Sequence, residues 1–187
     1  MPVNNKKFLI QCELKSCFKA VPFKDKAFKN YKYNEPSQFF NFFWKKYEKF
    51  KKTYKKKNNK EINNSYNGQA LEIILAYLFT REEIKIEKMD EDLKDVKYVK
   101  PDFLLKSKDN ENYFISAKVS IRERWKQADW EAIKYKKKYP LAKCILIMND
   151  KNEFKGLKSK IKNLDLDDVI LASSNDLNNL FDSIKNS

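Results

Sequence analysis

The stretch PDFLLKSKDNENYFISAK, residues 101–118, consists of two short apolar runs joined by a polar turn. Apolar runs of this length, separated by turn-forming residues, predict two antiparallel strands in a hairpin. A Pro-Asp pair opens the first run and a Ser-Ala-Lys triplet closes the second, although charged side chains do not belong within an ordinary hydrophobic strand. These polar ends predict that one edge of the sheet faces something other than the core.

Asp102, Ser116 and Lys118 are predicted to gather at this edge. Side chains two residues apart point to the same face of a strand, so Ser116 and Lys118 share a face. Asp102 lies early on the partner strand, where it can meet Lys118. A carboxylate beside an ammonium group is what a magnesium-dependent phosphodiesterase requires. The carboxylate holds the ion, and the ammonium group orients the attacking water and offsets the charge of the transition state.

The segments around the hairpin predict a central mixed β-sheet flanked by helices, in the α/β (α+β) class. The continuously apolar run at residues 142–149 is typical of a strand buried on both faces. The expected helices are 36–57, 69–83, 122–139 and 174–187, and the expected strands are 84–88, 98–107, 113–119, 142–149 and 168–173.

Residues 1–68 are predicted to form a basic, aromatic-rich helical extension for DNA contact or dimerisation, and residues 69–187 the core domain. In the 36–57 helix, with Ser37 as its expected N-cap, seven aromatic residues recur at helical spacing. We favour packing of this aromatic face on the core or on a partner subunit. Stacking of one ring, such as Trp44, on an extruded base is the alternative.

Positive charge is concentrated in the first third of the chain. The chain carries a formal charge of +14, of which residues 1–60 contribute +13 and residues 61–187 contribute +1. A basic arm on a nearly neutral body is typical of a polyanion-binding protein, because each neutralised phosphate releases condensed counterions. A genome rich in A·T pairs, which favours lysine codons, is the alternative explanation.

The absence of histidine excludes several classes of enzyme. Ser-His-Asp and Cys-His nucleophile systems and histidine-centred metal nucleases each need an imidazole. Cys12, Cys17 and Cys144 match neither a disulfide framework nor a zinc site, so we expect reduced thiols. No apolar stretch is long enough for a membrane span or a secretion signal, so we expect a cytoplasmic protein without membrane association.

The arrangement of Asp102 and Lys118 resembles the active site of the PD-(D/E)xK nuclease superfamily. The core of that superfamily has a helix, a three-stranded meander, a helix and a further strand, an order that residues 69–149 match. The chain departs from the motif at Ser116, which stands where the second acid belongs. In one branch of type II restriction endonucleases with this serine, the acid comes from the following helix, 12 or 13 residues after the lysine.

Glu131 satisfies that spacing, since 12 residues separate it from Lys118. The resemblance implies that Asp102 and Glu131 bind Mg²⁺, that Lys118 assists the water, and that Glu72 is the auxiliary acid. A competing acid-x-Lys triplet occurs at residues 153–155. We prefer the hairpin, because residues 153–155 are expected to lie in a turn, which cannot hold two side chains rigidly on one sheet face.

Arg122, Glu123 and Arg124 lie at the predicted start of the helix that carries Glu131. Arginine donates two hydrogen bonds to guanine, and glutamate accepts one from cytosine. The segment resembles that of restriction enzymes whose sites begin with CC and end with GG. A surface cluster of ion pairs is the alternative reading.

The resemblance as a whole implies a type II restriction endonuclease. Such an enzyme hydrolyses double-stranded DNA at a short site containing G·C pairs, depends on Mg²⁺, acts as a homodimer, and belongs to a restriction-modification pair with a separate DNA methyltransferase. Two alternatives remain open from the residues: a repair or junction-resolving nuclease on the same fold, and a basic nucleic-acid-binding module without catalysis.

Overall fold

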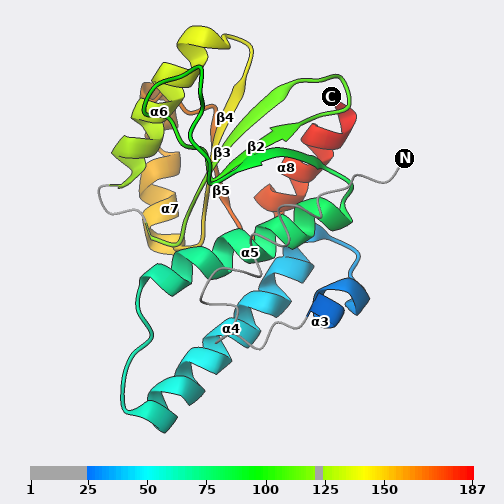
Figure 1. Cartoon of the computed structure of the whole chain (residues 1–187), viewed down its shortest axis with the longest axis vertical. Helices are drawn as coiled ribbons and strands as arrows, with labels where there is room; N and C mark the ends of the chain where they lie inside the picture. The colour runs from blue at the N-terminus through cyan, green and yellow to red at the C-terminus, as the bar shows by residue number, and fades with distance from the viewer. Residues whose placement is uncertain (1–24, 121–123) are drawn as a thin grey trace.

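The structure is a computed structural model that describes residues 25–120 and 124–187. Its framework is a five-stranded mixed sheet in the order β1-β2-β3-β4-β5 (Figure 1). The strands are β1 (Lys85–Met89), β2 (Phe103–Lys106), β3 (Asn112–Lys118), β4 (Lys143–Met148) and β5 (Asp168–Leu171). The helices are α3 (Asp25–Asn30), α4 (Pro36–Asn58), α5 (Ser65–Arg81), α6 (Arg124–Lys138), α7 (Lys151–Lys158), the short 3-10 turn η1 (Ile161–Asn163) and α8 (Asn175–Asn186).

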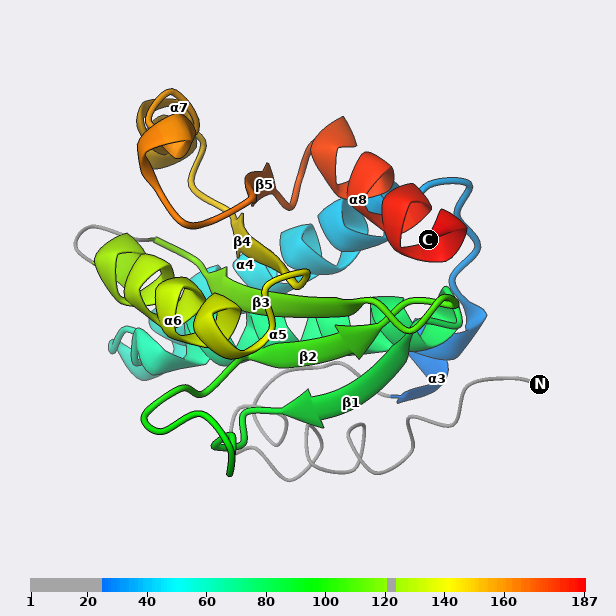
Figure 2. The same cartoon turned by 90° about the horizontal axis from the view of Figure 1, so that it is seen from above.

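The predicted hairpin is confirmed. Strands β2 and β3 pair antiparallel, with Phe103 opposite Ile115 and Lys106 opposite Asn112. Strand β3 pairs parallel with β4, and β4 parallel with β5, so the sheet is mixed as expected. The connection from β3 through α6 to β4 brings α6 back across the sheet next to β3 (Figure 2).

Helices cover both faces of the sheet (Figure 2). One hydrophobic cluster joins α4, α5 and α8 to one face, and a second joins α6 and α7 to the other. Alternate residues of β3 enter the two clusters, since Ile115 and Ala117 belong to the first and Phe114 belongs to the second. The strand that ends in Lys118 is therefore enclosed on both sides.

Helix α4 belongs to the first cluster. Its aromatic face, expected to pack on the core, is buried at Phe39, Phe40, Phe43 and Tyr47, whereas Trp44 is only partly buried. Residues 25–58 and α5 thus share one set of apolar contacts, and α5 spans residue 68. The division into residues 1–68 and 69–187 stays a prediction.

Three local expectations were wrong. Helix α4 has Glu35, not Ser37, as its N-cap, because Pro36 fixes the first turn, and Ser37 is buried with its N–H donating to Asn178 Oδ1. Helix α5 begins at Ser65, so Gly68 lies inside it. Residues 153–155 lie in α7 rather than in a turn, because the Asp150 side chain caps the N–H groups of residues 152 and 153.

The cysteines and the membrane-span expectation can also be compared with the structure. Cys144 is a free, buried thiol, whereas Cys12 and Cys17 lie outside the described residues. Within the described residues, every helix is too short or too polar to cross a bilayer.

Replacing Phe43 with alanine tests whether α4 and the sheet unfold together. Phe43 is fully buried and its ring stacks on that of Phe28 with centroids 4.2 Å apart. Phe43→Ala should lower the free energy of unfolding by about 3–5 kcal/mol, measured by chemical denaturation. Phe50→Ala, on the same helix but partly exposed, should cost less. Two separate transitions, with one shifted by Phe43→Ala, would show that α4 unfolds independently.

Candidate active site at the edge of the sheet

Asp102 and Lys118 form an ion pair where β2 begins and β3 ends. Lys118 Nζ donates to Asp102 Oδ2 at 2.6 Å, and the Ala117 backbone N–H donates to the same oxygen at 2.6 Å. The side chains of Asp102 and Lys118 are 12% and 19% exposed, so solvent reaches the pair but screens it poorly. Asp102 Oδ1 accepts no hydrogen bond from the described residues, which leaves one oxygen for a ligand.

Glu131 comes to the same face of the sheet from α6. This helix places Ala128 and Ala132 in the cluster that also contains Phe114 of β3, and it buries Glu131 between them. Alternation along β3 places Ser116 and Lys118 on the Phe114 face. Glu131 is 5% exposed, and its carboxylate does not extend into bulk solvent.

One oxygen of Glu131 is held by its own helix. Gln127, one turn earlier, donates from Nε2 to Glu131 Oε1 at 3.0 Å. Glu131 Oε2 accepts no hydrogen bond from the described residues. The two carboxylates therefore share a pattern: one oxygen is fixed by a protein donor and the other is available.

Burial raises the pKa of the Glu131 carboxyl above its ordinary value. The hydrogen bond from Gln127 and the charge of Lys118 lower this pKa, and the charge of Asp102 raises it. Glu131 thus interacts electrostatically with both members of the ion pair. A buried carboxyl with a raised pKa beside other charged groups is typical of functional sites.

The other predicted site residues lie around the group formed by Asp102, Lys118 and Glu131. Ser116 is 1% exposed in the middle of the sheet, with no carboxylate to offer. Glu72, on α5, lines a cleft of about 960 Å³ together with Lys118, Asp90 and Arg124. Glu72 and Lys118 therefore open onto the same cleft, Glu72 from α5 and Lys118 from the end of β3. Arg122 and Glu123 lie outside the described residues, whereas Arg124 is exposed at the first turn of α6.

The donor set suits a hard divalent cation. Within residues 25–120 and 124–187, no three His, Cys, Asp or Glu side chains are grouped to hold a metal ion. Mg²⁺, however, is commonly held by one or two carboxylates, with water and substrate oxygens completing the shell. Asp102 and Glu131 each have one available oxygen, and the charge of Asp102 disfavours ionisation of Glu131. A cation would relieve this repulsion, so the residues fit the ion.

Two polar residues near the site were missed from the sequence. Gln127 holds Glu131, and its i, i+4 spacing was a usable signal. Gln69 lines the cleft one turn before Glu72, and its Oε1 is buried without a hydrogen-bond partner in the part of the chain that the structure describes. No sequence signal marks Gln69, because its burial depends on how α5 packs.

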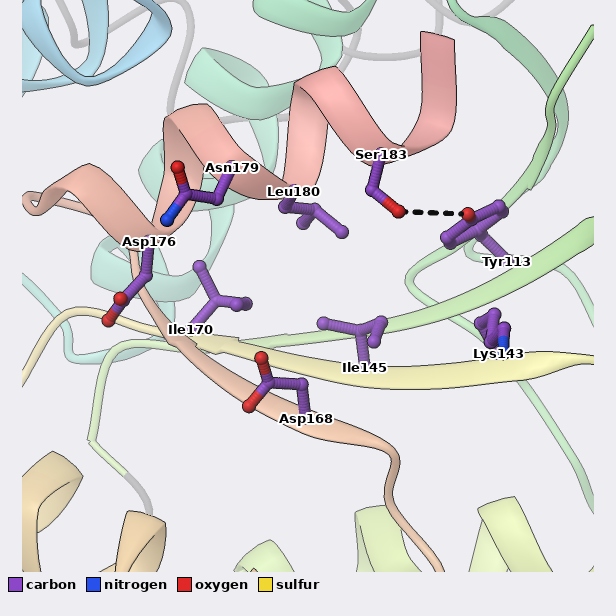
Figure 3. A pocket seen from close by; sticks show the side chains of 9 residues that line it. All are labelled: Tyr113, Lys143, Ile145, Asp168, Ile170, Asp176, Asn179, Leu180 and Ser183. Carbon is purple, nitrogen blue, oxygen red and sulfur yellow. Dashed lines mark hydrogen bonds between the residues drawn. The ribbon is translucent and has the colours of Figure 1, made fainter. Parts of the chain in front are cut away.

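A smaller hollow of about 300 Å³ lies between α8 and the strands (Figure 3). The Tyr113 hydroxyl is 3.4 Å from that of Ser183, and Asp168 is paired with Lys158. Tyr113 and Lys143 lie at the end of the paired strands opposite Lys118. This hollow is therefore separate from the candidate active site.

Comparisons with known proteins support the fold. No family model matches the chain, and no curated protein matches it. Among solved structures, it is similar to one described as a restriction endonuclease PspGI–substrate DNA complex, with a TM-score of 0.52 and 17% sequence identity. The match covers 88% of this chain and 74% of the other. The chain thus has a restriction-endonuclease-like α+β fold.

The raised pKa of Glu131 predicts a pH-dependent stability difference. The folded state holds the Glu131 proton more tightly than the unfolded state, so stability falls as pH rises from the ordinary pKa of 4.5 through the raised value. Glu131→Gln, which removes this titration and can still accept from Gln127, should be more stable than the parent at neutral pH. The difference should vanish below about pH 4.

Thermal melts across this pH range measure the effect. Glu111→Gln, an exposed substitution in the β2–β3 turn, is the control and should leave the pH dependence of the parent unchanged. A parent more stable than Glu131→Gln at neutral pH would contradict the argument.

Proposed function

We propose that the chain is a type II restriction endonuclease that hydrolyses double-stranded DNA with Mg²⁺. The observation that carries this proposal is the ion pair of Asp102 and Lys118 at the sheet edge, with buried Glu131 on the same face. The similar fold of a restriction endonuclease in complex with DNA adds support. The low sequence identity leaves the activity itself to experiment.

In this proposal each charged residue has a separate task. Asp102 and Glu131 would hold Mg²⁺ through their available oxygens, and the ion would supply Lewis-acid activation of water and stabilisation of charge on phosphorus. Lys118 would orient the attacking water and stabilise the developing negative charge with its ammonium group. The Ala117 N–H keeps Asp102 in place when Lys118 turns from the carboxylate towards phosphate.

The competing acid-x-Lys triplet at residues 153–155 lacks the geometry that this proposal requires. Glu153 and Lys155 satisfy the acid-x-Lys spelling, but in α7 residues two apart point about 200° from each other around the helix. They cannot act on one phosphate in the way that residues of one strand face can. Ser116, which takes the place of the acid in the strand, would serve packing alone.

Recognition is proposed to come from Arg122, Glu123 and Arg124. Arg124 is exposed and lines the cleft that contains Lys118, so a contact there would lie close to the scissile bond. Two-fold symmetric DNA cut on both strands calls for two equivalent sites, and we therefore propose a homodimer. Glu72 would support a second ion or orient Lys118.

Digestion of plasmid DNA of known sequence, with and without Mg²⁺, tests the activity. Discrete fragments with defined ends are expected only with Mg²⁺. Asp102→Asn, Lys118→Ala and Glu131→Gln should each lower the cleavage rate by roughly 10²-fold or more. The matched variants Glu153→Gln and Lys155→Ala should leave the rate unchanged.

Three outcomes would count against parts of this proposal. Ragged digestion without fixed ends would favour a repair or junction-resolving nuclease. Binding of DNA without Mg²⁺-dependent cutting would favour a binding module. Full activity of Glu131→Gln would discard Glu131 as the second acid.

Substitution of Arg124 tests recognition apart from catalysis. Arg124→Lys removes the forked donor pair but keeps the charge, so discrimination against sites with a changed G·C pair should fall by about 1–3 kcal/mol. Competition cleavage of cognate and single-substitution duplexes measures this ratio. Lys126→Gln, an exposed change two residues later, should weaken binding to all duplexes alike. An unchanged ratio for Arg124→Lys would exclude Arg124 from base recognition.

A further inference from the structure

Four lysines form a single row along the exposed side of α4. Lys45, Lys49, Lys52 and Lys56 follow the spacing i, i+4, i+7, i+11, which places them on one helix face. All four are exposed, and none has an ion pair or side-chain hydrogen bond with the described residues. We call these four residues the lysine row.

Three other lysines of α4 contact a carboxylate or an aromatic ring, whereas the lysine row has no such contact within residues 25–120 and 124–187. Lys51 pairs with Glu48, Lys55 pairs with Glu61, and Lys46 lies 4.5 Å above the ring of Phe42. Like charges three and four residues apart repel and destabilise a helix. An external polyanion that neutralised the row would relieve this repulsion, and the row is open to solvent and can receive one.

The opposite face of α4 fixes the row in space. Phe39, Phe40, Phe43 and Tyr47 are fully buried against the core, and the Tyr47 hydroxyl donates to Asn67 of α5 at 2.9 Å. The lysine row therefore begins on the anchored part of α4 and continues along its C-terminal half, where Phe50 still packs partly on the core. Less conformational entropy is lost when an anchored element binds than when a free tail does.

The connector that follows the row returns to the cleft. Helix α4 ends at Asn58, and the chain returns to the body through residues 59–64 (Figure 1). Asn63, Asn64 and Ser65 line the same cleft as Lys118 and Arg124. The five residues from Asn58 to Asn63 span at most about 18 Å when extended, and Lys56 lies about 3 Å further back along the helix, so the end of the row lies within about 21 Å of the cleft.

We propose that the lysine row binds the phosphate backbone of DNA that flanks the duplex held in the cleft. From Lys45 to Lys56 the helix rises roughly 16 Å. This rise matches the axial span of about five consecutive phosphates on one strand, at about 3.4 Å each. The row would contribute affinity without sequence preference, in contrast to Arg124. This inference rests on the proposed function only for the position of the DNA, not for cleavage.

The test is the salt dependence of binding without Mg²⁺. The affinity of a labelled mixed-sequence DNA duplex is measured by fluorescence anisotropy in EDTA between about 50 and 200 mM salt. Log affinity falls linearly with log salt, and each phosphate contact makes this fall steeper by about 0.9. The steepness of the fall should therefore decrease by about 3.6 in the quadruple variant K45Q/K49Q/K52Q/K56Q and by about 1.8 in K49Q/K52Q.

Two sets of control variants separate the position of the lysines from their charge. K108Q/K143Q removes two exposed lysines at the end of the sheet opposite Lys118, and should leave the slope unchanged. Lysine-to-arginine changes at all four positions of the row should retain the parent slope. Circular dichroism melts check the fold, and the quadruple variant should melt no lower than the parent, because repulsion is removed.

The outcomes separate this inference from the proposed nuclease. An equal slope for K49Q/K52Q and the parent would overturn the lysine row, even if specific cleavage is found. The expected slope loss would support the row even if no DNA is cut. A loss of binding to anionic phospholipid vesicles, with DNA binding unchanged, would overturn DNA as its partner.

Discussion

The ion pair of Asp102 and Lys118 depends on an exact register between β2 and β3. Two charges that are less than a fifth exposed carry a desolvation cost that their attraction offsets only when the geometry is good. The hairpin supplies this geometry, because the pairing of Phe103 with Ile115 places Asp102 beside the end of β3, where the Ala117 N–H also donates to it. A slip of one residue would turn Lys118 to the other face and leave Asp102 without its partner.

The charge of the site is opposite to that of the chain. Asp102, Glu131 and Lys118 together carry one net negative charge when all are ionised, in a protein with a formal charge of +14. Glu131, which is buried, and Asp102, which is partly buried, favour a small cation, whereas the exposed lysines of α4 favour a polyanion. Keeping these groups on separate elements prevents the lysines from neutralising the carboxylates. The proposed functions of the two regions are therefore compatible within one small domain.

The sequence predicted the hairpin, the mixed sheet and the meeting of Asp102 with Lys118, because two-residue alternation and turn chemistry are local signals. It also placed Glu131 on a helix over this face, from spacing and resemblance. It missed α7, although Asp150 followed by Glu153 is a capping pattern, because the short helix lacks a long apolar repeat. It could not show the buried Oε1 of Gln69 or the partial burial of Trp44, since both depend on how helices pack.

Moving an acid from a strand to a helix changes what controls its position. The backbone bonds of a sheet hold strand residues in place, but the height of α6 above the sheet is set by the side chains between them. Beside Glu131 these side chains are Ala128 and Ala132, both fully buried, which allow a close approach. A larger residue at either alanine would lift the carboxylate away from Lys118 without altering Asp102, Lys118 or Glu131 themselves. In the proposed nuclease, the volume of these two residues would therefore adjust the position of the helix-borne acid in small steps.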